Sequence, residues 1–355
     1  MAFYNRGMRA TLFVGSLLVV AGAGLNAQWL KLPTPGLPRL PDGKPNLEAS
    51  APRTADGKPD FSGLWSNDGG DRLYNNIAVD LQVSDVAPWA HQLFIKRSLE
   101  FSKDSPETQC LPLGPAYLTT RYREFRIVQT PALIVIAFED GMHREIFMDG
   151  RSLETEPNPT WMGYSVGRWD GDALVVDSNG YTDRSWLDYG GHPHTDELRI
   201  TERYSRKNIG RIDAQVTMTD PKIYAKPISF SMPITLVADT EMLEAFCENH
   251  QKSRARMSLT KAAQPVQVPA GTLARYVGTY DTDGDYSSKK VITVTADGAS
   301  LWFDYAGKGK ELLVPLSPTR FSWYGSIVEF STGAGTLANV AIHYAEGTER
   351  GTRRK

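Results

Sequence analysis

Residues 162–176 read Met-Gly-Tyr-Ser-Val-Gly-Arg-Trp-Asp-Gly-Asp-Ala-Leu-Val-Val and carry the clearest hairpin signal of the chain. β-Forming residues run from Met162 to Trp169, an Asp-Gly-Asp turn follows, and β-forming residues resume at Leu174. Two such runs joined by an Asp-Gly turn predict a β-hairpin. The surrounding chain is therefore expected to contribute neighbouring strands to the same sheet.

The same pattern continues on both sides of the hairpin, between Tyr122 and Cys247. The other predicted strands are Phe125 to Gln129, Leu133 to Phe138, Arg144 to Met148, Leu198 to Tyr204, Ile212 to Met218, Phe230 to Leu236 and Met242 to Cys247. Eight or nine consecutive strands without intervening helices predict an antiparallel meander, and closure into a barrel removes its edges. We expect an all-β fold with a lipocalin-like, up-and-down barrel, which encloses packed side chains or one small ligand.

Two different segments precede this barrel. Residues 28–60 form a proline-rich leader, in which Asp42-Gly43-Lys44-Pro45 recurs as Asp56-Gly57-Lys58-Pro59, and each copy predicts a turn that lays the leader on the domain. Apolar residues at three- and four-residue spacings from Val83 to Phe101 then predict one amphipathic helix. His91 lies off the apolar stripe and is expected to be solvated. The barrel domain is taken as residues 61–262.

A second β region follows a polar stretch after Gln251. Its predicted strands are Arg275 to Tyr280, Val291 to Thr295, Leu301 to Tyr305, Glu311 to Val314, Arg320 to Trp323, Ile327 to Phe330 and Val340 to Tyr344. Short strands separated by turn residues predict a small antiparallel domain over residues 270–355.

The N-terminus has the features of an export signal. Arg6 and Arg9 precede an apolar run that ends in small residues, so residues 1–27 are interpreted as a signal peptide and the mature protein as periplasmic or secreted. An oxidising compartment favours a disulfide between Cys110 and Cys247, the two cysteines of the chain. Two buried free thiols are the alternative.

Composition excludes several classes of function. Lys and Arg number 39 against 41 Asp and Glu, a net charge of −2, which gives no field to attract a nucleic acid. No membrane span is expected after signal cleavage, because the apolar run of the signal is too short to anchor the chain. The sequence contains no phosphate-binding loop or dinucleotide fingerprint.

Two resemblances can be stated from these motifs. The segment from Leu273 to Tyr280, with Leu316 to Phe321, resembles the small β domain that follows exported serine hydrolases of the penicillin-binding-protein-like class, although no Ser-x-x-Lys nucleophile setting accompanies it. The rest is similar to a broad group of exported bacterial proteins, through the DGKPDFSGLW, WMGYSVGRWDGD and DYGGHPH motifs. That resemblance implies no particular chemistry.

Candidate catalytic residues concentrate in a long polar loop from Asn179 to Thr195. His192 or His194 is expected to act as a general acid or base at the barrel mouth, with Asp188 orienting its ring. Glu202 shares a strand face with apolar residues, so it is expected to be a buried carboxylate with Arg168, Arg144 or Arg126 as partner. A purely structural role of these side chains is the alternative.

Metal binding by His192 and His194, with His143 as a third ligand, is a further alternative; no cofactor is otherwise expected. Aromatic and basic side chains in the same region are candidates for contacts to an apolar or aromatic small molecule. These substrate-binding candidates are Trp161, Tyr164, Arg168, Tyr181, Trp186 and Tyr189.

Three functions remain open from the sequence. The first is an exported, cofactor-independent enzyme of the isomerase, lyase or hydratase type, because proton-transferring groups are present and an activated nucleophile is not. The second is a small-molecule binding or carrier protein without catalysis. The third is an envelope protein whose small C-terminal domain binds a partner.

Overall fold

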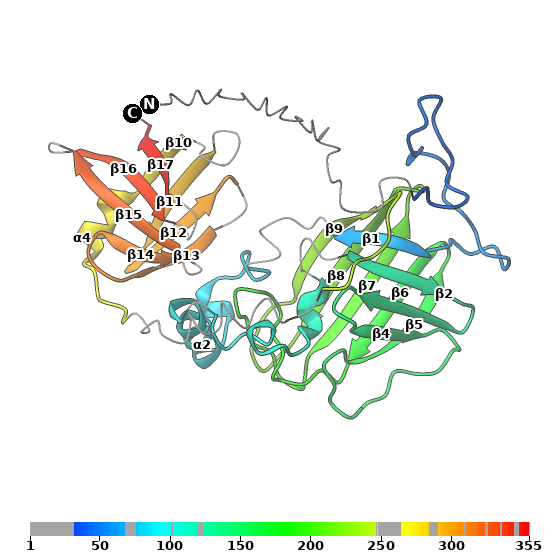
Figure 1. Ribbon diagram of the computed structural model, residues 1–355. Coiled ribbons are helices and arrows are strands. Elements are labelled where there is room, and N and C mark those ends of the chain that lie inside the picture. Colours follow the sequence, from blue (N-terminus) through cyan, green and yellow to red (C-terminus); the bar gives the residue numbers. More distant parts are fainter. Residues whose placement is uncertain are drawn as a thin grey trace, which may run out of the picture.

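The computed structural model describes residues 32–67, 76–100, 102–118, 124–245, 247, 264–283, 290–307, 310–323, 326–333, 336–343 and 348–354. The predicted signal peptide lies outside these residues. Nine strands close into one barrel and eight strands close into a second one (Figure 1). The predicted all-β class and the predicted barrel are both confirmed. Within the described residues, no helix is long and apolar enough to cross a membrane.

The first barrel contains all but one of the strands expected from the sequence. Its strands are β1 (Gly63–Asn67), β2 (Glu124–Gln129), β3 (Leu133–Phe138), β4 (His143–Phe147), β5 (Tyr164–Asp170), β6 (Ala173–Asn179), β7 (Arg199–Arg206), β8 (Arg211–Thr219) and β9 (Ile228–Leu236). Buried and more exposed residues alternate along β8, because side chains of a strand point to opposite faces and one face lines the barrel interior.

The strand that closes this barrel differs from the predicted one. The prediction of a strand from Met242 to Cys247 is wrong, because residues 242–245 and 247 have no strand structure. β1, near the start of the domain, takes its place and brings the barrel to nine strands. β1 pairs with both β2 and β9. Its Trp65 is fully buried and donates its indole N–H to the carbonyl of Phe61. A single five-residue strand lacks the length that reveals periodicity in a sequence.

One pair of neighbouring strands is parallel, which corrects the uninterrupted antiparallel meander. β4 and β5 run in the same direction, with Ile146 opposite Ser165, whereas the other neighbouring pairs are antiparallel. Directions alternate in a meander, so an odd number of strands cannot close without a parallel pair. The chain between Phe147 and Tyr164 returns from one end of the barrel to the other and accommodates this constraint.

The C-terminal region, predicted as a small antiparallel β domain, is also a closed barrel. Its strands are β10 (Gly278–Thr282), β11 (Val291–Asp297), β12 (Ser300–Tyr305), β13 (Lys310–Pro315), β14 (Arg320–Trp323), β15 (Ser326–Gly333), β16 (Thr336–His343) and β17 (Thr348–Arg353). The unpredicted β17 pairs with β16 and β10 and closes the ring. The short helix α4 (Ala270–Leu273) places Leu273 in the core of this barrel.

The predicted amphipathic helix is shorter than expected. Helix α2 spans Pro88–Leu99, with a 3-10 turn at Val83–Asp85 before it. Trp89, one of the apolar residues between Val83 and Phe101, is half exposed, whereas Ala90 and Phe94 are buried. Proline at the first helical position explains where α2 begins, because its missing N–H costs nothing there.

The leader contains two copies of one small hairpin. Arg39 donates to the carbonyl of Gly43 and pairs with Asp239, and Arg53 repeats both contacts with Gly57 and Asp172. Each glycine has a positive φ, which the tight turn requires. The duplicated motif therefore lays the leader on the first barrel, as expected.

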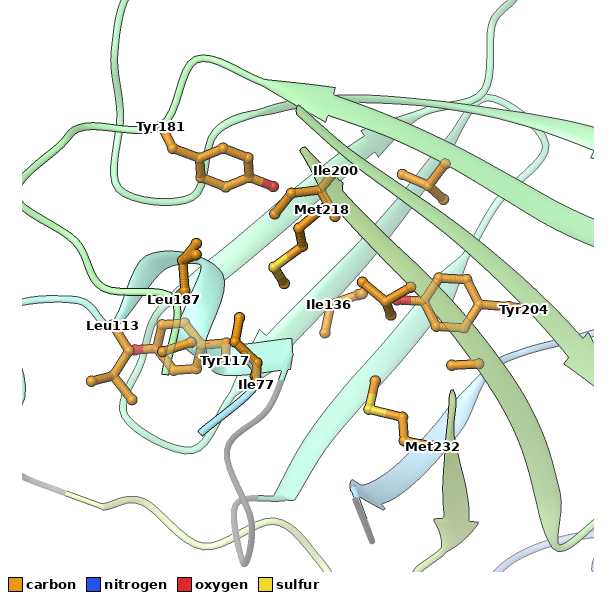
Figure 2. Packing of buried hydrophobic residues seen from close by; sticks show 14 of the residues in the cluster. Ile77, Leu113, Tyr117, Ile136, Tyr181, Leu187, Ile200, Tyr204, Met218 and Met232 are labelled. Carbon is orange, nitrogen blue, oxygen red and sulfur yellow. The ribbon is translucent and has the colours of Figure 1, made fainter. Parts of the chain in front are cut away.

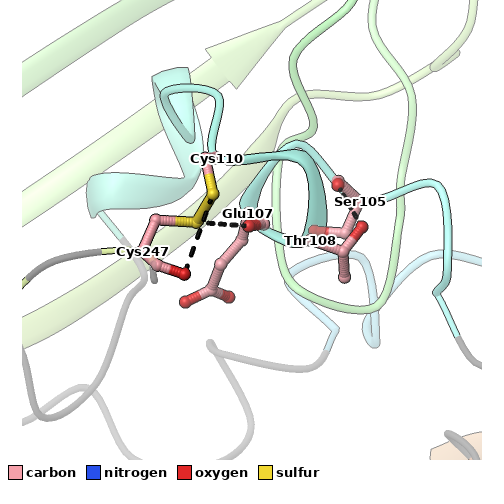
Figure 3. The surroundings of a disulfide bond; sticks show 5 residues. All are labelled: Ser105, Glu107, Thr108, Cys110 and Cys247. Atoms are coloured by element: carbon pink, nitrogen blue, oxygen red, sulfur yellow. Dashed lines mark hydrogen bonds between the residues drawn. A yellow bond between two sulfur atoms is a disulfide. The ribbon is translucent and has the colours of Figure 1, made fainter. Parts of the chain in front are cut away.

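The predicted disulfide between Cys110 and Cys247 is present (Figure 3). The two Cα atoms lie 5.5 Å apart, which is a normal separation for a disulfide. The bond joins the segment after α2 to the chain that follows β9, 137 residues later.

Candidate functional site

The first barrel encloses a cavity with mainly apolar walls. Its volume is about 50 Å³, measured as the space open to the centre of a water-sized sphere. One water molecule needs roughly 10–15 Å³ by that measure. Tyr117 and Tyr181, which lie outside the barrel strands, line this cavity together with strand residues such as Ile136 (Figure 2). By this measure the space corresponds to about three to five water molecules.

A buried polar network forms one wall of this cavity. Arg144 on β4 donates through Nη1 to Glu202 Oε1 at 3.0 Å and through Nη2 to Glu202 Oε2. Its remaining nitrogen donors reach Ser165 and Ser178 at 3.0 and 2.7 Å. The hydroxyl of Tyr204 donates to Glu202 as well. Charge is thus neutralised and hydrogen-bonded inside the network, as a buried ion pair requires.

The strand alternation of β7 accounts for the position of Glu202. Ile200, Glu202 and Tyr204 are all buried, as expected for residues that share the interior face. Among the three arginines considered as partners, Arg144 is the one that binds Glu202, whereas Arg126 pairs with Glu241 and Arg168 with Asp177 on the exposed surface.

Burial keeps the phenols of this wall protonated. It raises the pKa of Tyr204 well above its ordinary value, and the charge of Glu202 raises it further. Burial also raises the pKa of Tyr181. For Arg144, burial lowers the pKa and Glu202 raises it, with a net increase. These groups therefore act as hydrogen-bond donors near neutral pH and not as proton acceptors.

The loop between β6 and β7 packs inside the protein. Most of its residues from Gly180 to His194 are buried, so it forms part of the core at one end of the first barrel instead of an exposed lid. Within it, Asp188 is fully buried and accepts from the backbone N–H groups of Ile77, Gly191 and His192 at 2.9 to 3.1 Å. Its Oδ2 also lies 2.7 Å from Nδ1 of the His192 ring.

This arrangement fixes the histidine that Asp188 contacts. An ionised carboxylate accepts, so Nδ1 of His192 carries the proton and Nε2 is left for another partner. Phe94 stacks on the imidazole with ring centroids 3.9 Å apart. A second small cavity, of about 40 Å³ by the same measure, is lined by His192 and by His91 of α2. The Asp188–His192 pair has the geometry of an oriented acid or base.

His194 lies in a different environment from His192. Its Nδ1 lies 3.0 Å from the carbonyl of Thr195, so this nitrogen donates. Its Nε2 lies 2.7 Å from the hydroxyl of Ser185, which also lies 2.9 Å from the carbonyl of Thr182. Burial lowers the pKa of His194 and favours the neutral ring. Ser185 is fully buried too. The four predicted catalytic residues thus divide into three places: the Asp188–His192 pair, His194, and Glu202 in the barrel wall.

The predicted substrate-binding residues are not gathered around one cavity. Tyr181 lines the cavity of the first barrel, and the other five are not among its lining residues. Trp186 is covered by Arg97, Trp161 lies beneath Arg184, and Tyr164 contacts Phe147 and Arg151. Arg168 is exposed, and Tyr189 is half-buried in the loop.

Two residues of these sites were not anticipated from the sequence. His91 was expected in solvent but lines the second cavity, where burial and the neighbouring His192 lower its pKa. Its position three residues before Phe94 on α2 could have indicated this. Tyr204 shares the alternation of Glu202, which could have identified it as a cavity residue.

Within the part of the chain that the structure describes, no group of three or more His, Cys, Asp or Glu side chains is placed to hold a metal ion. His143, the third ligand considered, lies exposed at the start of β4. His192 and His194 each have separate partners.

A comparison of the chain with protein-family models finds no match, and a comparison with curated protein sequences finds none either.

Proposed function

We propose that the protein binds a small, mainly apolar or aromatic molecule inside the first barrel, as a binding or carrier protein. The observation that carries this proposal is the cavity between Ile127, Ile134, Ile136 and the polar wall around Arg144. An unfilled cavity costs stability, because the atoms that line it lose contacts. An apolar cavity of this kind stays dry and gains from an apolar occupant.

The chemistry of the lining favours binding over catalysis at this place. Among the described residues that line the cavity, the titratable ones are Arg144 and three tyrosines, Tyr117, Tyr181 and Tyr204. Arg144 is engaged by Glu202 and by two serine hydroxyls. The walls therefore offer shape and apolar contact, while a proton acceptor with ordinary basicity is missing from this part of the lining.

The proposed location is outside the cytoplasm. The disulfide between Cys110 and Cys247 is of the kind that persists in oxidising compartments. Together with the signal-like segment 1–27, it supports a periplasmic or secreted carrier.

Naphthalene is a suitable probe because it is apolar and compact. We expect saturable binding of one naphthalene per chain by isothermal titration calorimetry. Ile127→Phe places a ring in the cavity and should weaken binding at least tenfold. The matched control is Val128→Phe on the same strand, where the side chain is half exposed, and it should leave the affinity unchanged.

Two further outcomes decide the proposal. Ile127→Ala enlarges the cavity and should still bind naphthalene, which separates a blocked site from a misfolded barrel. Absence of saturable binding in the unmodified protein, or equal affinity in Ile127→Phe and Val128→Phe, would contradict the proposal.

A second candidate function is acid or base catalysis of the isomerase, lyase or hydratase type. The observation that favours it is the Asp188–His192 pair, in which Nε2 of His192 makes no hydrogen bond to another residue that the structure describes. His192→Ala should then abolish turnover while the barrel still binds naphthalene. Retained turnover in His192→Ala would refute this candidate.

A further inference from the structure

The second cavity is formed by residues of both barrels. From the first domain it is lined by His91, Phe94 and His192, and from the outer face of the second barrel by Trp302, Lys310 and Leu312. Trp302 and Leu312 are opposite each other on β12 and β13. Ligand sites occur preferentially where domains meet. The site is therefore complete only when the two barrels are together.

Two of the polar side chains that line this cavity, Lys310 and Asn76, offer hydrogen-bond donors. Lys310 contributes an ammonium group, and Asn76 contributes its side-chain amide nitrogen, since its Oδ1 accepts from the N–H of Ala78. His192 Nε2 makes no hydrogen bond within the described residues. Asp188 holds Nδ1 of this ring, and the ring lines the cavity.

Two of the acidic groups nearby, Asp188 and Glu311, are not available to these donors. Asp188 already accepts four hydrogen bonds, three from backbone and one from His192. Burial raises the pKa of Glu311 to about 8, so this carboxyl is largely uncharged at neutral pH. Asp304 lies on the neighbouring strand, opposite Lys310 in the register. Asp80 and Asp85 lie next to lining residues of the first domain, and Asp85 pairs with Lys226.

The rest of the lining is apolar. Phe94 stacks on His192, and Trp302, Leu312 and Val86 complete the walls. About 40 Å³ is open to the centre of a water-sized sphere, which is more than one water needs. A charged head group with an attached apolar body matches these two kinds of wall.

We propose that the cavity between the barrels binds a small organic monocarboxylate, with the carboxylate facing Lys310 and His192 and the apolar body against Trp302 and Phe94. A carboxylate accepts from the ammonium group of Lys310, and such charge-assisted bonds are the strong ones. This site does not depend on ligand binding inside the first barrel.

Benzoate is the probe, and its binding to the full mature chain is measured by isothermal titration calorimetry near neutral pH. Saturable binding with one benzoate per chain is expected. Lys310→Ala should weaken it at least tenfold. The matched control is Lys290→Ala, a lysine of the same barrel that lies over Tyr305 and does not line the cavity, and its affinity should be unchanged.

Three comparisons distinguish this site from others. Ile127→Phe, which fills the first barrel, should leave benzoate binding intact; loss of binding there would place benzoate in the barrel and overturn the inference. Benzyl alcohol, which lacks the charge, should bind at least tenfold more weakly than benzoate. Equal affinity for the two, no saturable binding of benzoate, or no effect of Lys310→Ala would also overturn it.

Discussion

The buried network around Arg144 and Glu202 yields the sharpest stability prediction. Both side chains are almost fully buried and joined by two hydrogen bonds. Glu202→Gln keeps the shape but leaves the guanidinium without a counter-charge. Removing one partner of a buried ion pair costs about 3–5 kcal/mol. That is a large part of the roughly 5–15 kcal/mol that holds a domain folded.

The magnitude follows from the number of donors that lose their acceptor. In Glu202→Gln, one oxygen remains for the two nitrogens of Arg144 and the hydroxyl of Tyr204. In Arg144→Met, the carboxylate keeps one donor, Tyr204. When both substitutions are combined, no unpaired charge is left in the barrel, so the cost should be several kcal/mol smaller than the sum of the two single costs.

The assay is equilibrium urea unfolding of all four proteins, followed by far-ultraviolet circular dichroism and tryptophan fluorescence. The free energy of unfolding is obtained by linear extrapolation, and a similar m-value in each variant shows that the same surface unfolds. A double variant whose loss equals the sum of the single losses would refute the reasoning, because Arg144 and Glu202 would then be independent groups.

Three further predictions concern other parts of the structure. Replacing Cys110 and Cys247 with alanine should lower the free energy of unfolding by about 3–5 kcal/mol, as expected for loss of a long cross-link; an unchanged urea midpoint would contradict this. The pKa of Glu311 is about 8 in the folded protein, whereas its ordinary value is 4.5, so unfolding releases a proton between pH 4.5 and pH 8. The stabilising effect of that proton is complete below pH 4.5 and is lost as pH rises towards 8, by at most about 5 kcal/mol. In urea unfolding at several pH values, Glu311→Gln should therefore show a flatter dependence of the free energy of unfolding on pH. An identical pH dependence in the variant would contradict this prediction. Gly163 has a positive φ, and an added Cβ would lie 2.6 Å from the Tyr181 ring, so Gly163→Ala should weaken naphthalene binding in calorimetry, whereas wild-type affinity would exclude such a displacement.

Much of the first barrel could be predicted because its signals are local. A run of β-forming residues placed β3 at Leu133 to Phe138, and alternation predicted that Glu202 shares the apolar face of β7. The Asp-Gly turn located the hairpin between β5 and β6. In each case, neighbouring residues along the chain carry the information, since the side chains of a strand repeat every two residues.

The strand that closes the barrel and the parallel pair could not be read in this way. β1 is too short for a periodic pattern, and its place follows from its pairing with β9, far along the chain. The parallel step at β4 and β5 follows from the odd number of strands. Register and closure depend on the whole sheet and not on any single segment.

The composition of the candidate sites shows the same division. The sequence by itself predicted the interior position of Glu202. It also placed Asp188 and His192 close together on one loop and contained two cysteines that suit an exported protein. Only the tertiary structure chose Arg144 as the partner of Glu202 and brought Lys310 near His192. These contacts join residues separated by dozens of positions or more, so they depend on strand register, loop path and domain packing, which local sequence patterns do not encode.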